Sequence, residues 1–520
     1  MQLAATDEFK VEWADPSDAA LSWGRDPMHT PLPVVPLAQT PGDAIESGVF
    51  GARTVWVNGH PFSSNSQIPE PAPEIAERGV VSVWEDDYLP RVRAYCQQVV
   101  STDWDALPMA ELPAAMDEVV AGSVEAFRLT MVVVRSFMGP TIQLAMWAER
   151  ELGADASTLI GTVLQGFDNH TSSAGTGLGE LAEMVARTPE LAAAIKAGIS
   201  ELSSVDGGPD FLAAFDRYLE DFGWRLESWS FLDTPTWYED RSVPLQLIRQ
   251  YLESPSTNPA EAIARAATQR EAALKEVESR LGPEKREIFR KLLDAASPHV
   301  SISESRAHWQ LTIKGVLRAP IMALGRKLVA AGVISTPPDI FYLEWDEAMA
   351  AARQPDGSLQ GLVDRRRADY ERWRSLSPVP AFIGAPPDDS AAPPEMKLVR
   401  KYFSGVGAPA PIEERVLSGF AASRGTHTGR ARVIRSLAES DRLEPGDVLV
   451  CITTAAPWTP LFAIAGAVVT DTGGVISHSA ICAREFAIPC VVGTQTATSQ
   501  IPDGALVTVD GDAGTVRILE

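Results

Sequence analysis

The longest stretch of regular patterning in the chain is helical and extends from about residue 81 to residue 375. Apolar residues recur there three and four positions apart, with charged residues between them, which is typical of amphipathic helices. One apolar stripe comprises Ile263, Ala267, Leu274, Val277 and Leu281, and a second, after a Gly-Pro break, comprises Ile288, Phe289, Leu292 and Leu293. The short break predicts an antiparallel helix pair.

Residues 1–80 have a different pattern, rich in Pro, Gly and Trp. Prolines recur through residues 23–43, and each proline biases the residue before it away from the helical conformation. This pattern predicts an extended or turn-rich segment, which we expect to pack on the helical body.

Residues 376–411 carry eight prolines in 36 positions and follow the end of the helical pattern. Such a segment is a semi-rigid spacer. It predicts a linker or hinge between two bodies that move relative to each other.

Residues 412–520 have a third pattern, in which short apolar runs are separated by turn pairs such as Pro445-Gly446 and Asp503-Gly504. These runs predict strands near residues 430–436, 447–453, 465–471, 490–494, 506–511 and 515–519. One helix is expected over residues 477–487. The predicted fold class is therefore multidomain α+β, a large and mainly helical body followed by a compact β-rich unit.

The amino-acid composition argues against several classes of binding partner and of structural site. The 45 basic and 69 acidic residues give a net charge of −24, which argues against binding to nucleic acid or to an anionic membrane surface. Four cysteines without a C-x-x-C pair form neither a disulfide framework nor a zinc site. No apolar run of 18 residues and no signal peptide is evident, so a cytoplasmic location is expected.

The stretch 465–493 carries the chemistry. A buried strand leads into Gly473-Gly474, and a helix begins near Ser477, a favourable N-cap residue. His478 then lies in the first helical turn, where backbone N–H groups and the helix dipole favour an anion. A neutral imidazole there is a possible nucleophile toward a phosphoryl group. The local pattern alone fits a surface histidine beside a turn equally well.

The same stretch resembles the phosphohistidine signature of phosphoenolpyruvate-utilising enzymes. The matching residues are Thr472, Gly473, Gly474, His478, Ala480, Ile481, Ala483, Arg484, Glu485, Ile488 and Pro489. The resemblance implies a swivelling β/β/α domain over residues 412–520 in which His478 carries phosphate. It also implies that the phosphohistidine loop is supported by Thr472, Gly473, Gly474, Ser477, Arg484 and Glu485.

A helical body followed by this domain resembles the rifamycin phosphotransferases and the phenol-phosphorylating enzymes of the phenylphosphate synthase and hydroxyacetophenone or acetovanillone phosphotransferase type. No stretch of the chain resembles an ATP-grasp kinase domain. The resemblance therefore implies a separate ATP-grasp kinase subunit that binds ATP and Mg²⁺ and phosphorylates His478. No metal site is expected on this chain.

The acceptor is expected to bind in the helical body, residues 81–375, where aromatic and polar side chains gather in blocks. His308 is a candidate general base, and the other candidate contacts are Arg306, Trp309, Trp237, Phe231, His29 and His170. Core packing is the competing interpretation for the aromatic residues. The predicted function is a phosphotransferase for a small phenolic hydroxyl. The alternatives are a component of a rifamycin-type antibiotic phosphotransferase and a phosphocarrier or regulatory protein without its own acceptor.

Overall fold

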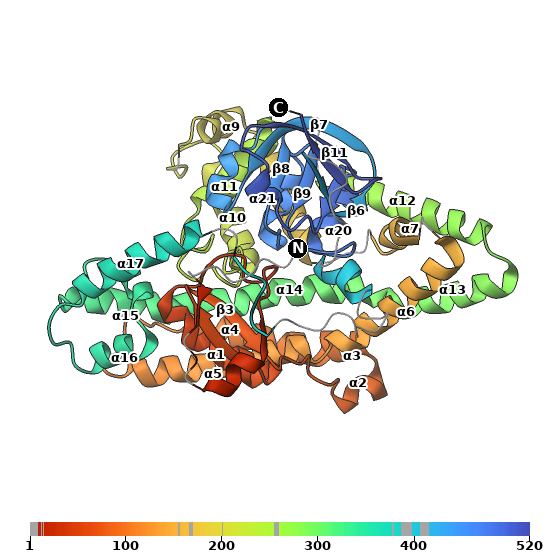
Figure 1. Cartoon of the computed structure of the whole chain (residues 1–520). Coiled ribbons are helices and arrows are strands. Elements are labelled where there is room, and N and C mark those ends of the chain that lie inside the picture. Colours follow the sequence, from red (N-terminus) through yellow and green to blue (C-terminus); the bar gives the residue numbers. More distant parts are fainter. Residues whose placement is uncertain are drawn as a thin grey trace. The chain divides into compact units, whose positions relative to one another are not determined.

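The computed structural model describes residues 9–519 apart from 12, 14, 154–155, 166–169, 200, 254–258, 377–378, 386–397 and 406–414. The chain forms two compact units that interleave along the sequence. Unit 1 comprises Met1–Ser136, Ser228–Pro235 and Trp309–Ala391, and unit 2 comprises Phe137–Glu227, Thr236–His308 and Ala392–Glu520. Figure 1 shows the helices and strands coloured along the chain.

This division differs from the linear boundaries at residues 80, 375 and 412 that the sequence predicts. The helical region contributes to both units, and helices α6 (Val134–Leu152) and α14 (Pro298–Val316) each begin in one unit and end in the other. Apolar residues between 178 and 251 share a core with the C-terminal strands, which joins them to that domain in one unit.

Unit 1 contains a small antiparallel sheet in the order β2-β3-β1-β4. Its strands are β1 (Ser22–Gly24), β2 (Arg53–Val57), β3 (His60–Ser64) and β4 (Phe382–Gly384). Phe9, Trp23, Phe62 and Ile383 form the core of this sheet. The chain returns to its N-terminal part at β4, which lies in the segment predicted to be a linker.

Helices make up the rest of unit 1. They are α1 (Pro36–Phe50), α2 (Pro73–Arg78), α3 (Val80–Val83), α4 (Leu89–Ser101), α5 (Leu112–Met131), α15 (Arg318–Ala330), α16 (Trp345–Arg353) and α17 (Gln360–Ser375), with the second half of α14. The end of α17 at Ser375 confirms the predicted end of the helical pattern.

Helix α1 corrects the expectation that residues 23–43 are extended. Pro36 stands at the first helical position, which proline tolerates because its missing N–H would have no partner there. The buried residues Leu37, Pro41, Ile45 and Val49 then follow at intervals of four and form one face. The proline content concealed this helical spacing.

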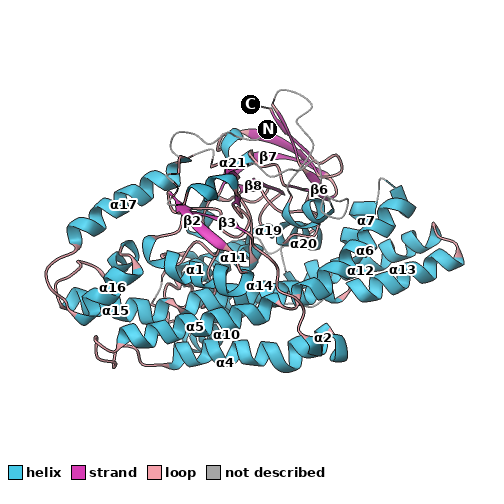
Figure 2. Ribbon diagram, turned by 60° about the horizontal axis from the view of Figure 1, so that its bottom comes forward, coloured by secondary structure: helices cyan, strands magenta, loops and turns pink. Residues whose placement is uncertain are grey.

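Unit 2 begins with a series of helices. They are most of α6, then α7 (Ala156–Val163), α8 (His170–Ala186), α9 (Pro189–Lys196), α10 (Gly208–Phe222), α11 (Ser242–Glu253), α12 (Pro259–Ser279) and α13 (Pro283–Ala296). The predicted pair is present as α12 and α13, with Val277, Leu281 and Phe289 in one core and an ion pair between Glu278 and Arg290. Figure 2 shows the chain reversing between these two helices.

The C-terminal part of unit 2 is an eight-stranded sheet in the order β5-β12-β11-β7-β8-β9-β10-β6. The strands are β5 (Val416–Ser418), β6 (Phe420–Ser423), β7 (Thr426–Val433), β8 (Val448–Cys451), β9 (Ala467–Thr470), β10 (Cys490–Val492), β11 (Leu506–Asp510) and β12 (Thr515–Ile518). All six predicted strands are present, and β7 to β10 run parallel. The expected helix is α20 (His478–Glu485).

The central strands are buried on both faces, which explains their continuous apolar runs. In β8, Val448 and Val450 face one core, whereas Leu449 and Cys451 face the core shared with α8, α10 and α11. All four cysteines are buried and free, so the prediction that they form no disulfides is confirmed.

Much of the predicted linker, residues 386–397 and 406–411, lies outside the described residues. Its described parts are ordered elements: β4, and the short π-helix η8 (Arg400–Ser404). The hinge itself remains a prediction.

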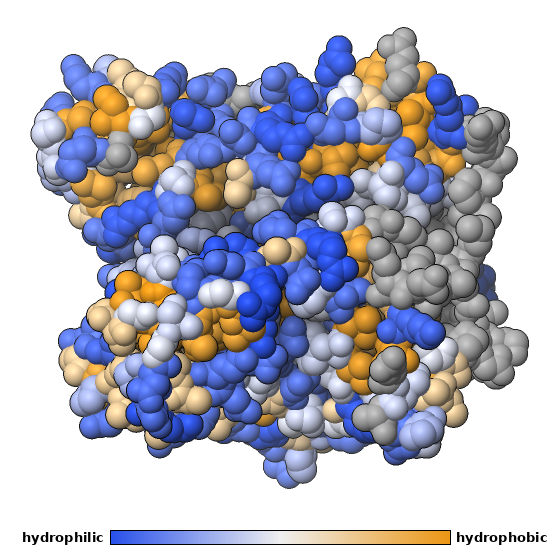
Figure 3. Space-filling model, turned by 60° about the vertical axis from the view of Figure 1, so that its left-hand side comes forward, coloured by the Kyte–Doolittle hydropathy of each residue, from blue (hydrophilic) through white to orange (hydrophobic). Residues whose placement is uncertain are grey.

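One continuous run among the described residues, Leu112–Leu152, is long and apolar enough to cross a membrane, and 56% of its most apolar window is buried within the protein. Such burial is typical of a core helix. On the face shown in Figure 3, hydrophilic residues surround separate hydrophobic patches.

We predict that Gly474→Ala destabilises the protein by about 1–3 kcal/mol, the usual cost of overpacking. A methyl group at Gly474 would overlap the backbone of Tyr402 and lie 2.5 Å from the Lys401 carbonyl oxygen. Urea unfolding measures the effect. Gly361→Ala is the matched control, because its added methyl meets only the end of Arg365 at 3.8 Å on α17. Equal stability of the two variants would contradict the prediction.

Candidate functional site

The loop that joins β9 to α20 is fixed by main-chain contacts. Gly473 has φ +92°, which favours glycine. The N–H groups of Gly473, Gly474, Val475 and Ile476 donate to carbonyl oxygens of η8 at 2.9–3.1 Å. The N–H groups of this loop are therefore satisfied by η8. The first turn of α20 keeps the N–H groups that a helix start leaves unpaired.

His478 is the first residue of α20 and is partly buried. Its Nδ1 lies 2.9 Å from the Thr454 hydroxyl oxygen, and its Nε2 lies 3.3 Å from that of Thr459 and 3.4 Å from the Cys482 sulfur. The edge of the Phe462 ring completes the surroundings, with centroids 6.2 Å apart. Every heteroatom of the ring thus has a defined neighbour.

The electrostatic environment keeps this imidazole neutral. Burial, together with the positive charge of Arg225, lowers the pKa of His478 to about 3. A neutral histidine retains a nitrogen lone pair, which a nucleophile requires.

Arg225 is itself buried, at 3% exposure, in the segment that follows α10. Its guanidinium lies over the Trp237 ring at 4.9 Å and near the Phe222 ring at 5.5 Å, and it shares a hydrogen bond with Tyr218. No carboxylate among the described residues forms an ion pair with it, and its Nε and one terminal nitrogen have no hydrogen-bond partner there. A buried cation of this kind is costly unless an anion accompanies it.

One arrangement of protons prepares the ring for attack. The Nδ1–H donates to Thr454, whose hydroxyl donates in turn to Ser479 Oγ at 2.8 Å. Thr459 donates its own proton to the Ala456 carbonyl. Nε2 then keeps its lone pair and is the nitrogen able to bond to phosphorus.

The residues expected to support the loop lie around it. Thr472 donates to the Ile452 carbonyl oxygen at 3.0 Å, and the Arg484 guanidinium donates to the carbonyl oxygens of Ala422 and Val475 at 2.7 and 2.8 Å. Glu485 is buried on the same helix. Ser477 occupies the N-cap position, but its side chain makes no capping hydrogen bond.

Two regions of the chain match models of known protein families. Residues 443–514 match the mobile domain of PEP-utilising enzymes, and residues 130–304 match the fourth domain of rifampicin phosphotransferase. The chain is therefore similar to PEP-utilising enzymes over its C-terminal region and to rifampicin phosphotransferase over part of its helical region. The mobile-domain match includes His478 and the whole β9–α20 loop.

Individual relatives match longer parts of the chain. Chondramide synthase cmdD of Chondromyces crocatus is 30% identical over 98% of the chain and 14% of the relative. The uncharacterised phosphotransferase YvkC of Bacillus subtilis is 32% identical over 61% and 38%. A rifampicin phosphotransferase of a Streptomyces species is 29% identical over 72% and 42%. The chain thus spans less than half the length of each of these relatives.

The candidate acceptor residues are divided between the two compact units. In unit 2, Trp237 lies against Arg225, and the buried His308 meets the edge of the Phe222 ring at 5.7 Å. The two therefore share the aromatic surroundings of Arg225. Arg306 lies near the Phe137 ring, and burial lowers its pKa to about 10. The side chain of His170 lies outside the described residues.

The remaining candidates belong to unit 1. Trp309 lies beneath Arg93, at 5.4 Å from ring centroid to guanidinium, and Phe231 is a buried core residue. His29 stacks on Trp229 with centroids 4.1 Å apart. Helix α14 passes from unit 2 to unit 1 between His308 and Trp309. Residues that are neighbours in the sequence therefore belong to different units.

Three residues that act on His478 were missed in the sequence. Thr454 and Thr459 belong to the Thr-x-x-x-Trp-Thr-Pro turn, which resembles a family feature, but a turn motif alone does not place hydroxyls on an imidazole. Arg225 stands as a lone charge in the run Gly223-Trp224-Arg225-Leu226, a pattern that could have flagged a functional cation.

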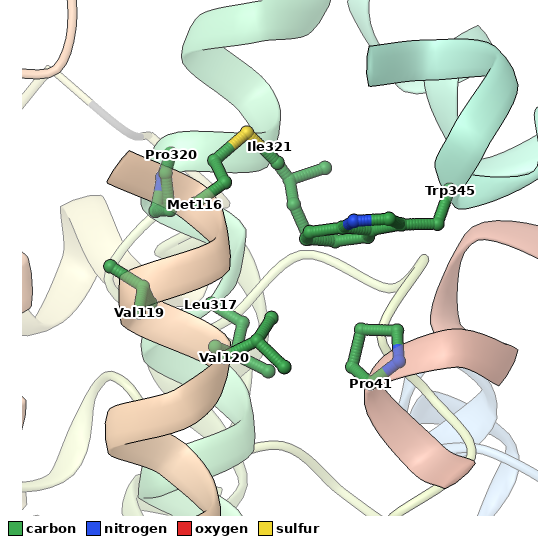
Figure 4. Close-up of a pocket in the computed structure, with 8 residues that line it drawn as sticks. All are labelled: Pro41, Met116, Val119, Val120, Leu317, Pro320, Ile321 and Trp345. Carbon is green, nitrogen blue, oxygen red and sulfur yellow. The ribbon is translucent and has the colours of Figure 1, made fainter. Parts of the chain in front are cut away.

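One apolar pocket of unit 1 does not serve as an acceptor site. Its lining is entirely without charged side chains and comprises Pro41, Met116, Val119, Val120, Leu317, Pro320, Ile321 and Trp345 (Figure 4). Its volume of about 10 Å³ is close to the minimum for one water molecule.

We predict that the ring nitrogens of His478 show no titration between pH 8 and pH 5 in ¹⁵N NMR of histidine-labelled protein. The folded pKa of about 3 lies below the unfolded value near 6.5, so the unfolded chain binds the extra proton first. Stability relative to His478→Ala therefore falls as pH drops from 6.5 toward 3. His478→Ala also assigns the signal, and a midpoint near pH 6.5 would contradict the analysis.

Proposed function

We propose that this protein is a phosphotransferase that works through a phosphohistidine at His478. A separate ATP-dependent kinase subunit of the ATP-grasp type phosphorylates His478, and the phosphoryl group then passes to the hydroxyl of a small aromatic substrate. The observation that carries the proposal is the neutral His478 beside Arg225, a buried cation without a carboxylate partner among the described residues.

The chemistry follows from these two side chains. The Nε2 lone pair attacks the γ-phosphorus of ATP, and the bond from phosphorus to the leaving oxygen of ADP breaks. The new phosphoryl group carries negative charge into a buried site, where Arg225 supplies the opposite charge. In the second half-reaction, the acceptor hydroxyl gives its proton to a base and its oxygen attacks phosphorus. The electron pair of the P–N bond then returns to Nε2 of His478, whose Nδ1 has kept its proton.

ATP and Mg²⁺ are assigned to the kinase partner in this proposal. The described residues contain no group of three or more His, Cys, Asp or Glu side chains that could hold a metal ion. Mg²⁺ would neutralise charge on the phosphates of ATP during the first half-reaction.

A phenol is the proposed acceptor, because aromatic side chains gather near Arg225 and His308. Two histidines are candidate bases for the acceptor. His308 lies against Phe222, which the Arg225 guanidinium also contacts, and His29 lies in unit 1 against Asp26. A larger natural product of the rifamycin type is the second candidate, favoured by the match of residues 130–304 to a rifampicin phosphotransferase domain.

We expect acid-labile phosphate on the wild-type protein after incubation with Mg-ATP and an extract of the organism that makes it. His478→Ala should carry none, because it lacks the nucleophile, and His427→Gln is the matched control, since His427 only bonds the Gly446 carbonyl. Radiolabel on the protein is the measurement. Labelling by Mg-ATP without extract would refute the separate kinase, and equal labelling of His478→Ala would refute the proposed function.

We also expect that the isolated phosphoprotein loses its label to an added acceptor and forms an acid-stable phosphate ester. Simple phenols and rifamycin are supplied side by side, and the labelled product is separated by chromatography. Transfer to phenols supports the first candidate, and transfer to rifamycin alone supports the second. Label that leaves to neither class, with or without extract metabolites, would favour a phosphocarrier and contradict the proposed acceptor.

A further inference from the structure

Unit 1 holds a second group of polar side chains that the phosphohistidine site does not use. His29 and Asp26 lie in the turn after β1, Trp229 in the segment 228–235, Lys314 on α14 and Glu46 on α1. Separate parts of the chain thus place an imidazole, two carboxylates and an amine around one indole ring.

Asp26 and His29 form a dyad. The Asp26 carboxylate lies 2.5 Å from His29 Nδ1 and also accepts the backbone N–H groups of Met28 and His29. The ring of His29 is stacked on Trp229 at 4.1 Å with an interplanar angle of 20°, and its carbonyl oxygen accepts from Ser228 Oγ. These contacts fix both the position and the tautomer of the imidazole.

The contact with Asp26 prepares His29 to act as a general base. With Nδ1–H donated to Asp26, the neutral ring keeps its lone pair on Nε2, the arrangement that lets a histidine remove a proton from a hydroxyl. The His29 side chain is 31% exposed. The imidazole is therefore partly accessible to solvent.

Lys314 adds a positive charge at the same ring. Its ammonium lies 5.0 Å from the Trp229 ring centroid and 5.9 Å from that of Phe127. The negative charge of Glu46 acts on it. Burial lowers its pKa to about 8, so near neutral pH it remains mostly protonated. A cation there stabilises an oxygen as it loses its proton.

We propose that Asp26, His29 and Lys314 form the site that binds and deprotonates the aromatic hydroxyl of the acceptor. This inference rests on the proposed function for the transfer step, but not for the binding of a phenol. The acceptor proton moves to His29 Nε2 and the acceptor oxygen attacks phosphorus. The P–N bond breaks with its electron pair left on Nε2 of His478, whose Nδ1 keeps its proton. Asp26 is a positioning residue, because it acts through His29.

The first test uses 4-nitrophenol, whose phenolate absorbs at a longer wavelength than the phenol. We expect the full-length protein to raise the ratio of phenolate to phenol in the bound probe about tenfold at a fixed pH near neutrality. His29→Phe keeps the stacked ring and should lose the shift, and Lys314→Met and Asp26→Asn should weaken it. His427→Gln is the control and should match the wild type.

Several charged groups among the described residues face His29 and can change the response of the bound probe to pH. These groups are Asp26 on its own turn, Glu46 on α1 and Lys314 on α14, with Arg25 acting on Asp26. Absence of any spectral shift with the wild type would overturn the proposed site. A shift that His29→Phe retains in full would overturn the role of the dyad.

The second test separates this inference from the proposed function. His29→Phe should be phosphorylated on His478 to the wild-type extent but should pass the group to a phenol about 10²–10⁴ times more slowly. Asp26→Asn should also displace the pH profile of transfer, which a merely structural role would leave unchanged. Wild-type transfer by His29→Phe would refute the inference, whereas loss of phosphorylation in every variant and in wild type would refute the proposed function instead.

Discussion

The site around His478 depends on one electrostatic constraint: the charge of a buried guanidinium disfavours protonation of the imidazole. Arg225 is stacked between aromatic rings and has no carboxylate partner among the described residues. Its charge and the burial of His478 together hold the imidazole pKa far below its ordinary value. Such a pair is unfavourable in isolation, because the cation is desolvated without compensation. A phosphoryl group on His478 would supply the missing negative charge.

The fold of unit 2 serves this constraint. The buried parallel strands end at one edge of the sheet, where β9 leads through Gly473-Gly474 into α20. Carbonyl oxygens of η8 accept hydrogen bonds from the N–H groups of that loop. The loop backbone is therefore fixed without hydrogen bonds from the functional side chains. Helices α8, α10 and α11 share a core with the opposite side of the strands and bring the Arg225 segment to the histidine. Main-chain hydrogen bonds and core packing thus fix the β9–α20 loop, and the side chain of His478 remains available to react.

Much of this architecture could be predicted from the sequence, where the signal was local. Continuous apolar runs such as Val448–Cys451 identify strands because burial on both faces leaves no polar positions. The loop could be identified because Gly473-Gly474, which allow a tight turn, lie only a few residues before the candidate nucleophile His478. Helix α1 was missed because its prolines obscured a buried face at intervals of four residues.

The rest could not be predicted, because it depends on contacts between distant segments. Arg225 and His478 are far apart in sequence, and neither residue's neighbours indicate the other. His308 and Trp309 are adjacent in sequence but belong to different compact units. The dyad of Asp26 and His29 is local, yet its aromatic and cationic surroundings come from Trp229 and Lys314. Spacing patterns describe single elements and do not specify which elements meet.

The most direct measurement of the central claim is the thermal stability of the protein before and after phosphorylation, in wild type and in Arg225→Met. If Arg225 is the counter-ion of the phosphoryl group, phosphorylation raises the Tm of the wild type, and this gain disappears in Arg225→Met. Arg217→Met, which removes an exposed arginine on α10, is the control and should keep the gain. A gain of equal size in Arg225→Met, or a loss of stability on phosphorylation of the wild type, would contradict the account.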